Sequence, residues 1–273
     1  MNFSPSYQKG QILLIIILVM VVSLTIGLSV VSRSIVNLRT TEEEENSQKA
    51  FSAAEAGIER LINSSAESLT LSDEVGTNAS FNAKITSYAK NSSSFLVYNY
   101  NLIPKDDGAD VWLANYPTYT SPLNAQVTVY WGSPSDTCTN NESTNTESAL
   151  QIVVISGNIN SPQNLTMTHY MLEPCSARAS VNNFSQNIQS GGIIGGKQFT
   201  HSYTISVTNG LLMRIVPLYA PTRLGISSTQ PLPAQGQIIE STGVASNTER
   251  KLTVYKGYPT LPVEIFPHGI FSP

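Results

Sequence analysis

Residues 11–32 read QILLIIILVMVVSLTIGLSVVS, an apolar segment of 22 residues that contains no charge. As a helix rising 1.5 Å per residue it would cover about 33 Å, and the hydrocarbon core of a bilayer is about 30 Å thick. A cleavable secretory signal has a shorter apolar core, of about 7–15 residues, followed by a small-x-small site that this segment lacks. The segment therefore predicts a transmembrane helix that is retained as an anchor.

The helix is expected to continue past the membrane through residues 33–63. No proline occurs between Pro5 and Pro104, and residues 39–60 are rich in Glu, Ala and Gln, which favour helices. A continuous helix from Gln11 to about Ile62 would be about 78 Å long. Its first half would lie in lipid and its second half would be amphipathic.

Two neighbouring stripes of side chains in the second half suit packing against a sheet or another helix. One stripe is apolar and the other is made of small residues; the members are Phe51, Ala54, Ile58 and Leu61, and Ala50, Ala53 and Gly57. The acidic run Glu42–Glu45 precedes them. It has two interpretations: a solvated face at the membrane surface, or a docking patch for basic residues of a neighbour.

Charge gives an orientation only in combination with composition. Lys9 flanks the apolar segment on one side and Arg33 and Arg39 on the other, so the positive-inside rule nearly balances. The polar, Asn/Ser-rich composition beyond residue 63 and the two cysteines favour an extracytoplasmic head on a single-pass anchor. A net charge of -4 and a pI near 5.4 give no reason to expect nucleic-acid binding.

Two motifs in register carry a resemblance to a known family. Lys9-Gly10 followed by Gln11-Ile12-Leu13-Leu14 resembles a prepilin peptidase site, in which a short basic leader ends in glycine before an uncharged helix. The segment AFSAAEAGIE at 50–59 is similar to the N-terminal region of PilX-type minor pilins and of K-type pseudopilins of type II secretion. The resemblance covers residues 9–62. It implies that residues 1–10 are a leader, removed between Gly10 and Gln11.

One position departs from most major pilins. They carry a glutamate at the fifth position after cleavage, where this chain has Ile15. In the family that carboxylate neutralises a neighbour's N-terminal amine in lipid, where an unpaired charge is costly. PilX-type and K-type members often lack it as well. The resemblance thus implies a minor subunit at a filament tip or in assembly initiation.

Beyond residue 64 the pattern changes from helical to alternating. Ala125, Val127, Val129 and Trp131 share one face of a predicted strand, and 14 of the 15 prolines lie at or after Pro104. We expect eight to twelve mostly antiparallel strands in residues 64–273, with a possible domain split near 180–200. The predicted fold class is α+β: a long N-terminal helix followed by a β-rich head.

The two cysteines, Cys138 and Cys175, have no zinc-type spacing. In an exported head they are expected to form a disulfide. The chain-entropy model gives such a bridge about 4 kcal/mol of stabilisation. The alternative is two unpaired thiols in the core.

Other candidate sites favour structural interpretations. Gly191–Lys197 (GGIIGGK) matches the start of a P-loop, but Gln198 replaces the required Ser or Thr, so a hairpin is the better interpretation. Asp106, Asp107 and Asp110 are candidate calcium ligands, although their spacing does not fit an EF-hand and a D-G turn explains them equally. We assign no metal and no cofactor.

Nothing in the sequence argues for catalysis. The histidines His169, His201 and His268 are far apart, and the first two share the phase of apolar neighbours, which favours structural roles. No G-x-S-x-G or H-E-x-x-H motif occurs. The expected function is that of a minor pilin-like subunit whose partners are other pilins or pseudopilins, prepilin peptidase and the membrane. The alternative is a membrane-anchored adhesin or binding module that never enters a filament.

Overall fold

The chain has one long N-terminal helix followed by a mostly antiparallel β-rich head, so the predicted α+β class is confirmed. The computed structural model describes residues 11–64, 66, 68–76, 78–139 and 144–260. They divide into two compact units, which we call the helix unit (residues up to 64, 70–84 and 240–252) and the sheet unit (65–69, 85–239 and from 253 onward).

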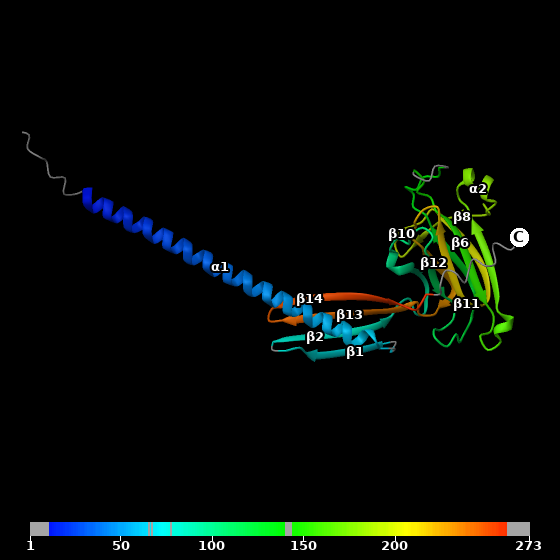
Figure 1. Cartoon of the computed structure of the whole chain (residues 1–273), viewed down its shortest axis with the longest axis horizontal. Coiled ribbons are helices and arrows are strands. Elements are labelled where there is room, and N and C mark those ends of the chain that lie inside the picture. The colour runs from blue at the N-terminus through cyan, green and yellow to red at the C-terminus, as the bar shows by residue number, and fades with distance from the viewer. Residues whose placement is uncertain (1–10, 65, 67, 77, 140–143, 261–273) are drawn as a thin grey trace, which may run out of the picture. The chain divides into compact units, whose positions relative to one another are not determined.

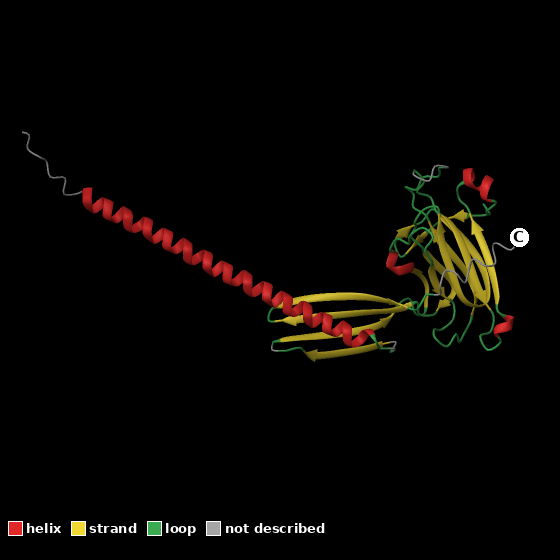
Figure 2. Cartoon of the chain, viewed as in Figure 1, coloured by secondary structure: helices red, strands yellow, loops and turns green. Residues whose placement is uncertain are grey.

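The helices and strands are shown in Figures 1 and 2. In chain order they are α1 (Gln11–Ile62), β1 (Ser68–Glu74), β2 (Ala79–Ser87), β3 (Ser92–Leu96), β4 (Ala109–Trp112), β5 (Leu123–Trp131), β6 (Ala149–Ser156), β7 (Thr166–Leu172), α2 (Ser176–Asn182), β8 (Gln189–Ser190), β9 (Ile193–Ile194), β10 (Lys197–Gln198), β11 (His201–Leu218), β12 (Gly225–Leu232), β13 (Gly236–Ala245) and β14 (Thr248–Gly257), with short 3₁₀ turns at Val97–Tyr100 and Pro162–Asn164.

The first helix is unbroken over 52 residues, as the sequence predicts. Its continuity follows from the lack of proline and from long runs of good helix formers on both sides of Arg33. Its best 18-residue window has a mean hydropathy of 3.0 and is not buried by the rest of the chain, so α1 is long and apolar enough to cross a membrane.

In the helix unit, the C-terminal part of α1 lies along a four-stranded sheet of order β1-β2-β13-β14 (Figures 1 and 2). Two glycines permit the close approach. A Cβ on Gly57 would lie 2.3 Å from Ser241 Oγ and 2.8 Å from Phe81 Cδ2. A Cβ on Gly243 would lie 1.9 Å from the carbonyl oxygen of Ala50, so only glycine fits at that strand position.

The sheet unit is built on an eight-stranded sheet with the path β3-β12-β5-β11-β6-β7, to which β4 and β8 add by pairing with β11. Strand β11 spans 18 residues and organises this sheet. Its first half pairs antiparallel with β5 and its second half with β6 and β4. The core between them is apolar, with Val127, Val129, Trp131, Ile152 and Ile215 fully buried.

Two expectations about the head need correction. The possible split near 180–200 is wrong, because β8 and the strands before it pair with β11, and residues on both sides therefore share one sheet. The described residues contain 14 strands rather than eight to twelve. Three of these, β8, β9 and β10, are only two residues long, which is too short to leave an alternating pattern in the sequence.

Candidate functional site

The first half of α1 exposes large apolar side chains on every side. From Leu13 to Leu38 each Leu, Ile, Val and Met is between 48% and 72% exposed. Such a surface is unfavourable in water, because transferring one side chain of this size from water to an apolar environment is favourable by roughly 1.5–3 kcal/mol. A band of this length and hydropathy suits the hydrocarbon core of a membrane.

The second half of α1 buries one narrow face against the four-stranded sheet of the helix unit. Ala50, Ala53 and Ala54 are fully buried, and Ile58 and Leu61 are 8% and 1% exposed. Phe51, predicted to pack on a sheet or on another helix, is 43% exposed and is not covered by the sheet of its own chain. The buried face is centred on the small-residue stripe, which lets the helix approach the strands, so Phe51 at its margin points away.

The resemblance-based positions are only partly described. Lys9 and Gly10 of the expected cleavage site lie outside the described residues, and Gln11 is the first residue of α1. Ile15, where most major pilins have glutamate, lies in the apolar band and is 58% exposed.

The second half of α1 forms two exposed ion pairs, one with the neighbouring sheet and one within the helix. Arg60 pairs with Asp73 of β1, and its guanidinium holds the pKa of that carboxyl below its usual value. Within the helix, Lys49 lies 2.6 Å from Glu45 and lowers the pKa of that carboxyl in the same way. Glu45 of the acidic run is thus engaged inside the chain, whereas Glu42–Glu44 are exposed.

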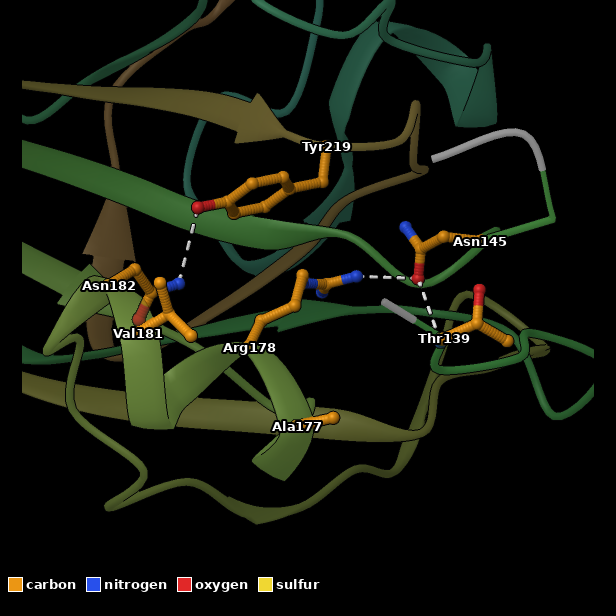
Figure 3. Close-up of a pocket in the computed structure, with 7 residues that line it drawn as sticks. All are labelled: Thr139, Asn145, Ala177, Arg178, Val181, Asn182 and Tyr219. Carbon is orange, nitrogen blue, oxygen red and sulfur yellow. Dashed lines mark hydrogen bonds between the residues drawn. The ribbon is translucent and has the colours of Figure 1, made fainter. Parts of the chain in front are cut away.

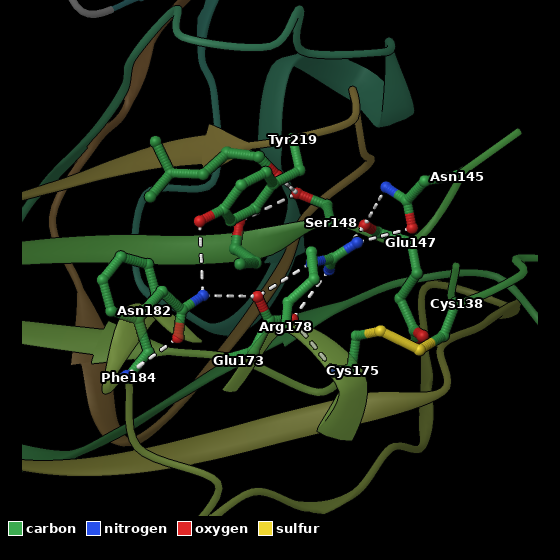
Figure 4. A network of polar contacts seen from close by, with 12 residues as sticks. Cys138, Asn145, Glu147, Ser148, Glu173, Cys175, Arg178, Asn182, Phe184 and Tyr219 are labelled. Carbon is green, nitrogen blue, oxygen red and sulfur yellow. Dashed lines mark hydrogen bonds and ion pairs between the residues drawn. A yellow bond between two sulfur atoms is a disulfide. The ribbon is translucent and has the colours of Figure 1, made fainter. Parts of the chain in front are cut away.

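In the sheet unit, Cys138 and Cys175, which are 37 positions apart in the sequence, are joined by a disulfide. Cys175 directly precedes α2, so the bridge ties the start of this short helix to the polar loop that carries Cys138 (Figure 4). The expected pairing is therefore present, and no described cysteine is free.

A buried polar network surrounds this bridge (Figure 4). Glu173 is fully buried and receives two hydrogen bonds from Arg178, at 2.7 and 2.9 Å. Arg178 also donates to Asn145 Oδ1 at 2.5 Å and to the carbonyl of Glu147 at 3.0 Å. A buried ion pair is tolerated only when its remaining donors and acceptors are satisfied in this way.

A pocket of about 360 Å³ opens beside this network (Figure 3). It is lined by Thr139, Asn145, Ala177, Arg178, Val181, Asn182 and Tyr219. The Arg178 guanidinium lies 4.6 Å from the centre of the Tyr219 ring, and the Tyr219 hydroxyl accepts a hydrogen bond from Asn182. Among the lining residues that the structure describes, only Arg178 is charged, and Glu173 neutralises it, so the pocket suits a neutral, largely apolar ligand.

The three candidate calcium ligands do not converge. Asp110 is buried and pairs with buried Arg214 at 3.0 Å, while Asp107 accepts a hydrogen bond from the amide of Gly108. Among the described residues, the one grouping close enough for a metal is Cys138, Glu147 and Cys175. Its two sulfurs are bonded to each other and supply no thiolate. Because the carboxylate of Asp110 pairs with Arg214, Asp110 does not join Asp106 and Asp107 in a calcium site.

The remaining candidates lie in structural elements of the sheet unit. His201 lies 2.5 Å from Glu147 and packs 5.5 Å from the Trp131 ring, and His169 is partly buried on β7. Gly191–Lys197 forms the β9–β10 hairpin, with Gly195 and Gly196 at positive φ in its two-residue turn. A P-loop lysine opens a helix, whereas Lys197 opens a strand. His268 lies outside the described residues.

Sequence reasoning missed the two buried ion pairs, Glu173–Arg178 and Asp110–Arg214. Their spacings of five and 104 residues carry no local signal. Comparison with known proteins adds no relative: no family model, no curated protein and no solved structure matches the chain.

Proposed function

We propose that this chain is a minor pilin-like subunit of a type IV pilus or pseudopilus-like machine. It is inserted in the cytoplasmic membrane by α1 with its head outside, and it acts at the filament tip or in assembly initiation. Other pilins or pseudopilins contact it through the N-terminal helix, and prepilin peptidase removes residues 1–10.

One observation carries the proposal: a single helix has two consecutive halves with different surroundings. The half from Leu13 to Leu38 is apolar and uncovered, whereas the half from Ala50 to Leu61 is fixed to the sheet of its own chain. A subunit that leaves the bilayer for a filament needs such a helix, because the apolar band exchanges lipid for neighbouring helices without unfolding the head.

The position in the filament rests on Ile15. A repeating subunit has to pair each N-terminal amine with an acceptor in a low-dielectric surrounding, where an unpaired charge costs several kcal/mol. A subunit that lacks the carboxylate suits a place where no amine above it needs pairing, which is the tip. Low copy number is therefore expected.

Quantitative mass spectrometry of sheared filaments tests this proposal. We expect a few molecules of this chain per filament. When its gene is deleted, we expect fewer filaments, each of normal length. An abundance comparable to that of the main subunit would contradict the tip assignment. An equal number of filaments that are shorter would contradict a role in initiation.

The pocket beside α2 favours a second candidate function, a membrane-anchored adhesin or binding module. Its walls are held by a disulfide and a buried ion pair, and Val181 at its edge is 82% exposed. Absence of the chain from sheared filaments, with full retention in the cell membrane, would favour this candidate over the filament subunit.

A further inference from the structure

Two cations from distant segments of the sheet unit lie on the same tyrosine ring. The ammonium of Lys197 is 5.0 Å from the centre of the Tyr100 ring, and the guanidinium carbon of Arg223 is 5.1 Å from it. Both distances are within the range of cation–π attraction. Because each charge lies about 5 Å from one centroid, the two are at most about 10 Å apart.

The backbone that presents Tyr100 is strained. Tyr98, Asn99 and Tyr100 are three consecutive residues at positive φ, with values of 47°, 56° and 69°. L-residues other than glycine rarely adopt this conformation, and they usually do so singly. Strain of this kind is retained where the surrounding structure fixes it, and it clusters at functional sites.

The surrounding structure does fix all three segments. Ile103 and Thr222 form an antiparallel bridge, and Arg223 Nε donates to the Tyr100 carbonyl at 3.1 Å. The β9–β10 hairpin that carries Lys197 packs through buried Phe199, whose ring lies 6.0 Å from the Tyr100 ring. The segments that carry Tyr100, Lys197 and Arg223 are thus fixed to one another, and Arg223 is held further by its hydrogen bond.

No carboxylate among the described residues forms an ion pair with either cation. Elsewhere, exposed Lys49, Arg60 and Lys251 each pair with a carboxylate, as do buried Arg178 and Arg214. Within residues 11–64, 66, 68–76, 78–139 and 144–260, neither Lys197 nor Arg223 has an acidic partner. Two neighbouring positive charges sum to a local positive potential, which attracts an anion placed between or beside them.

We infer that Tyr100, Lys197 and Arg223 form a binding site for an acidic saccharide, in which the cations bind sugar carboxylates. A sparsely charged ligand fits the surroundings, since the sheet unit has seven Lys and Arg against nine Asp and Glu. Duplex DNA carries one negative charge per about 1.7 Å and needs a wider basic surface. The site uses Lys197 of the GGIIGGK segment for an anion in a manner unrelated to a P-loop.

Calorimetric titration of the full chain tests the site, in a polyoxyethylene detergent that has neither sugar nor phosphate. The ligands are oligogalacturonate, a neutral oligogalactose of equal length and a short DNA duplex. Lys197→Gln/Arg223→Gln removes both charges. Lys84→Gln/Lys251→Gln is the matched control, because it removes two exposed charges from the helix unit. Unchanged thermal unfolding of each variant verifies its fold.

We expect oligogalacturonate to bind and its affinity to fall with added salt. The Lys197/Arg223 variant should bind about tenfold more weakly or not at all, and the control variant should match the parent. Absence of binding by the parent, or equal loss in both variants, overturns the inference. Tighter binding of oligogalactose or of DNA also overturns it and identifies a neutral-sugar or a nucleic-acid site instead. This outcome is independent of whether the chain enters a filament.

Discussion

The two halves of α1 share one backbone conformation and differ in everything that surrounds them. From Leu13 to Leu38 the side chains are large, apolar and uncovered by the chain; from Ala50 to Leu61 the inward face is small and buried. Helix propensity and the absence of proline keep the backbone continuous, whereas side-chain size decides what each half can contact. Continuity of a helix therefore says nothing about a common environment along it.

Truncating one buried and one exposed side chain of the sheet-bound half should give the largest difference. Leu61→Ala removes a side chain that is 1% exposed and should cost about 3–4 kcal/mol of the free energy of unfolding. Phe51→Ala, at 43% exposure, should cost less than about 1 kcal/mol. Denaturant titration in detergent measures both. Equal losses would mean that Phe51 packs against the sheet after all.

A charge in the apolar half should disturb the membrane and leave the head folded. Val21→Arg places a cation near the centre of the segment and should disfavour insertion by about 3 kcal/mol. Fractionation of cells expressing the variant would show chain lost from the membrane. The control is Phe51→Arg, which adds the same charge to an exposed position of the other half. If both variants stay in the membrane equally, the apolar half is not the anchor.

Two glycines of α1 lie in different steric surroundings, Gly57 in the sheet-bound half and Gly27 in the apolar half. Gly57→Leu forces a Cβ against Ser241 and Phe81 and should cost about 2 kcal/mol of stability through overpacking. Gly27→Leu meets no atom within 4 Å and should leave stability unchanged or slightly raised. Thermal unfolding of the two variants in one detergent decides it. A comparable loss of stability in both variants would show that leucine destabilises the helix itself, and not its contact with the sheet.

The smallest effect concerns the ion pair at the end of the sheet-bound half. Arg60 lowers the pKa of Asp73, so this pair stabilises the fold above the ordinary aspartate pKa of about 4, and the contribution is lost as pH falls through the depressed value. Asp73→Asn should remove that part of the pH dependence. Melting temperatures of parent and variant should converge at low pH. Parallel curves over the whole range would contradict the role of Asp73.

The extent of α1 was predictable, because a long segment without proline and rich in helix formers leaves few alternatives. Ala54, Ile58 and Leu61 of the predicted apolar stripe are buried against the sheet, whereas Phe51 is not. A helical period of 3.6 identifies one face of a helix but does not determine how far a neighbouring sheet covers it. The presumed boundary near 180–200 rested on local Gly and Asn. The 18-residue strand β11 overrides such signals by pairing with segments on both sides of them.

The side-chain chemistry of the sheet unit was less predictable. The disulfide followed from having only two cysteines in an expected exported head. The approach of Lys197 and Arg223 to Tyr100 depends on tertiary contacts between residues 97 and 123 positions apart, which no local pattern encodes. The glycine-rich segment before Lys197 resembles a P-loop in sequence, but in the structure it forms a β-hairpin.

The central claim is that α1 begins a processed subunit that uses its apolar half for assembly. Mass spectrometry of the mature N-terminus, on protein purified from its own host, tests it most directly. We expect the chain to begin at Gln11 when prepilin peptidase is active, and to retain the leader in a host that lacks the peptidase and in the Gly10→Val variant. Recovery of the intact Met1 terminus from cells with active peptidase would contradict the claim and leave α1 as a plain membrane anchor.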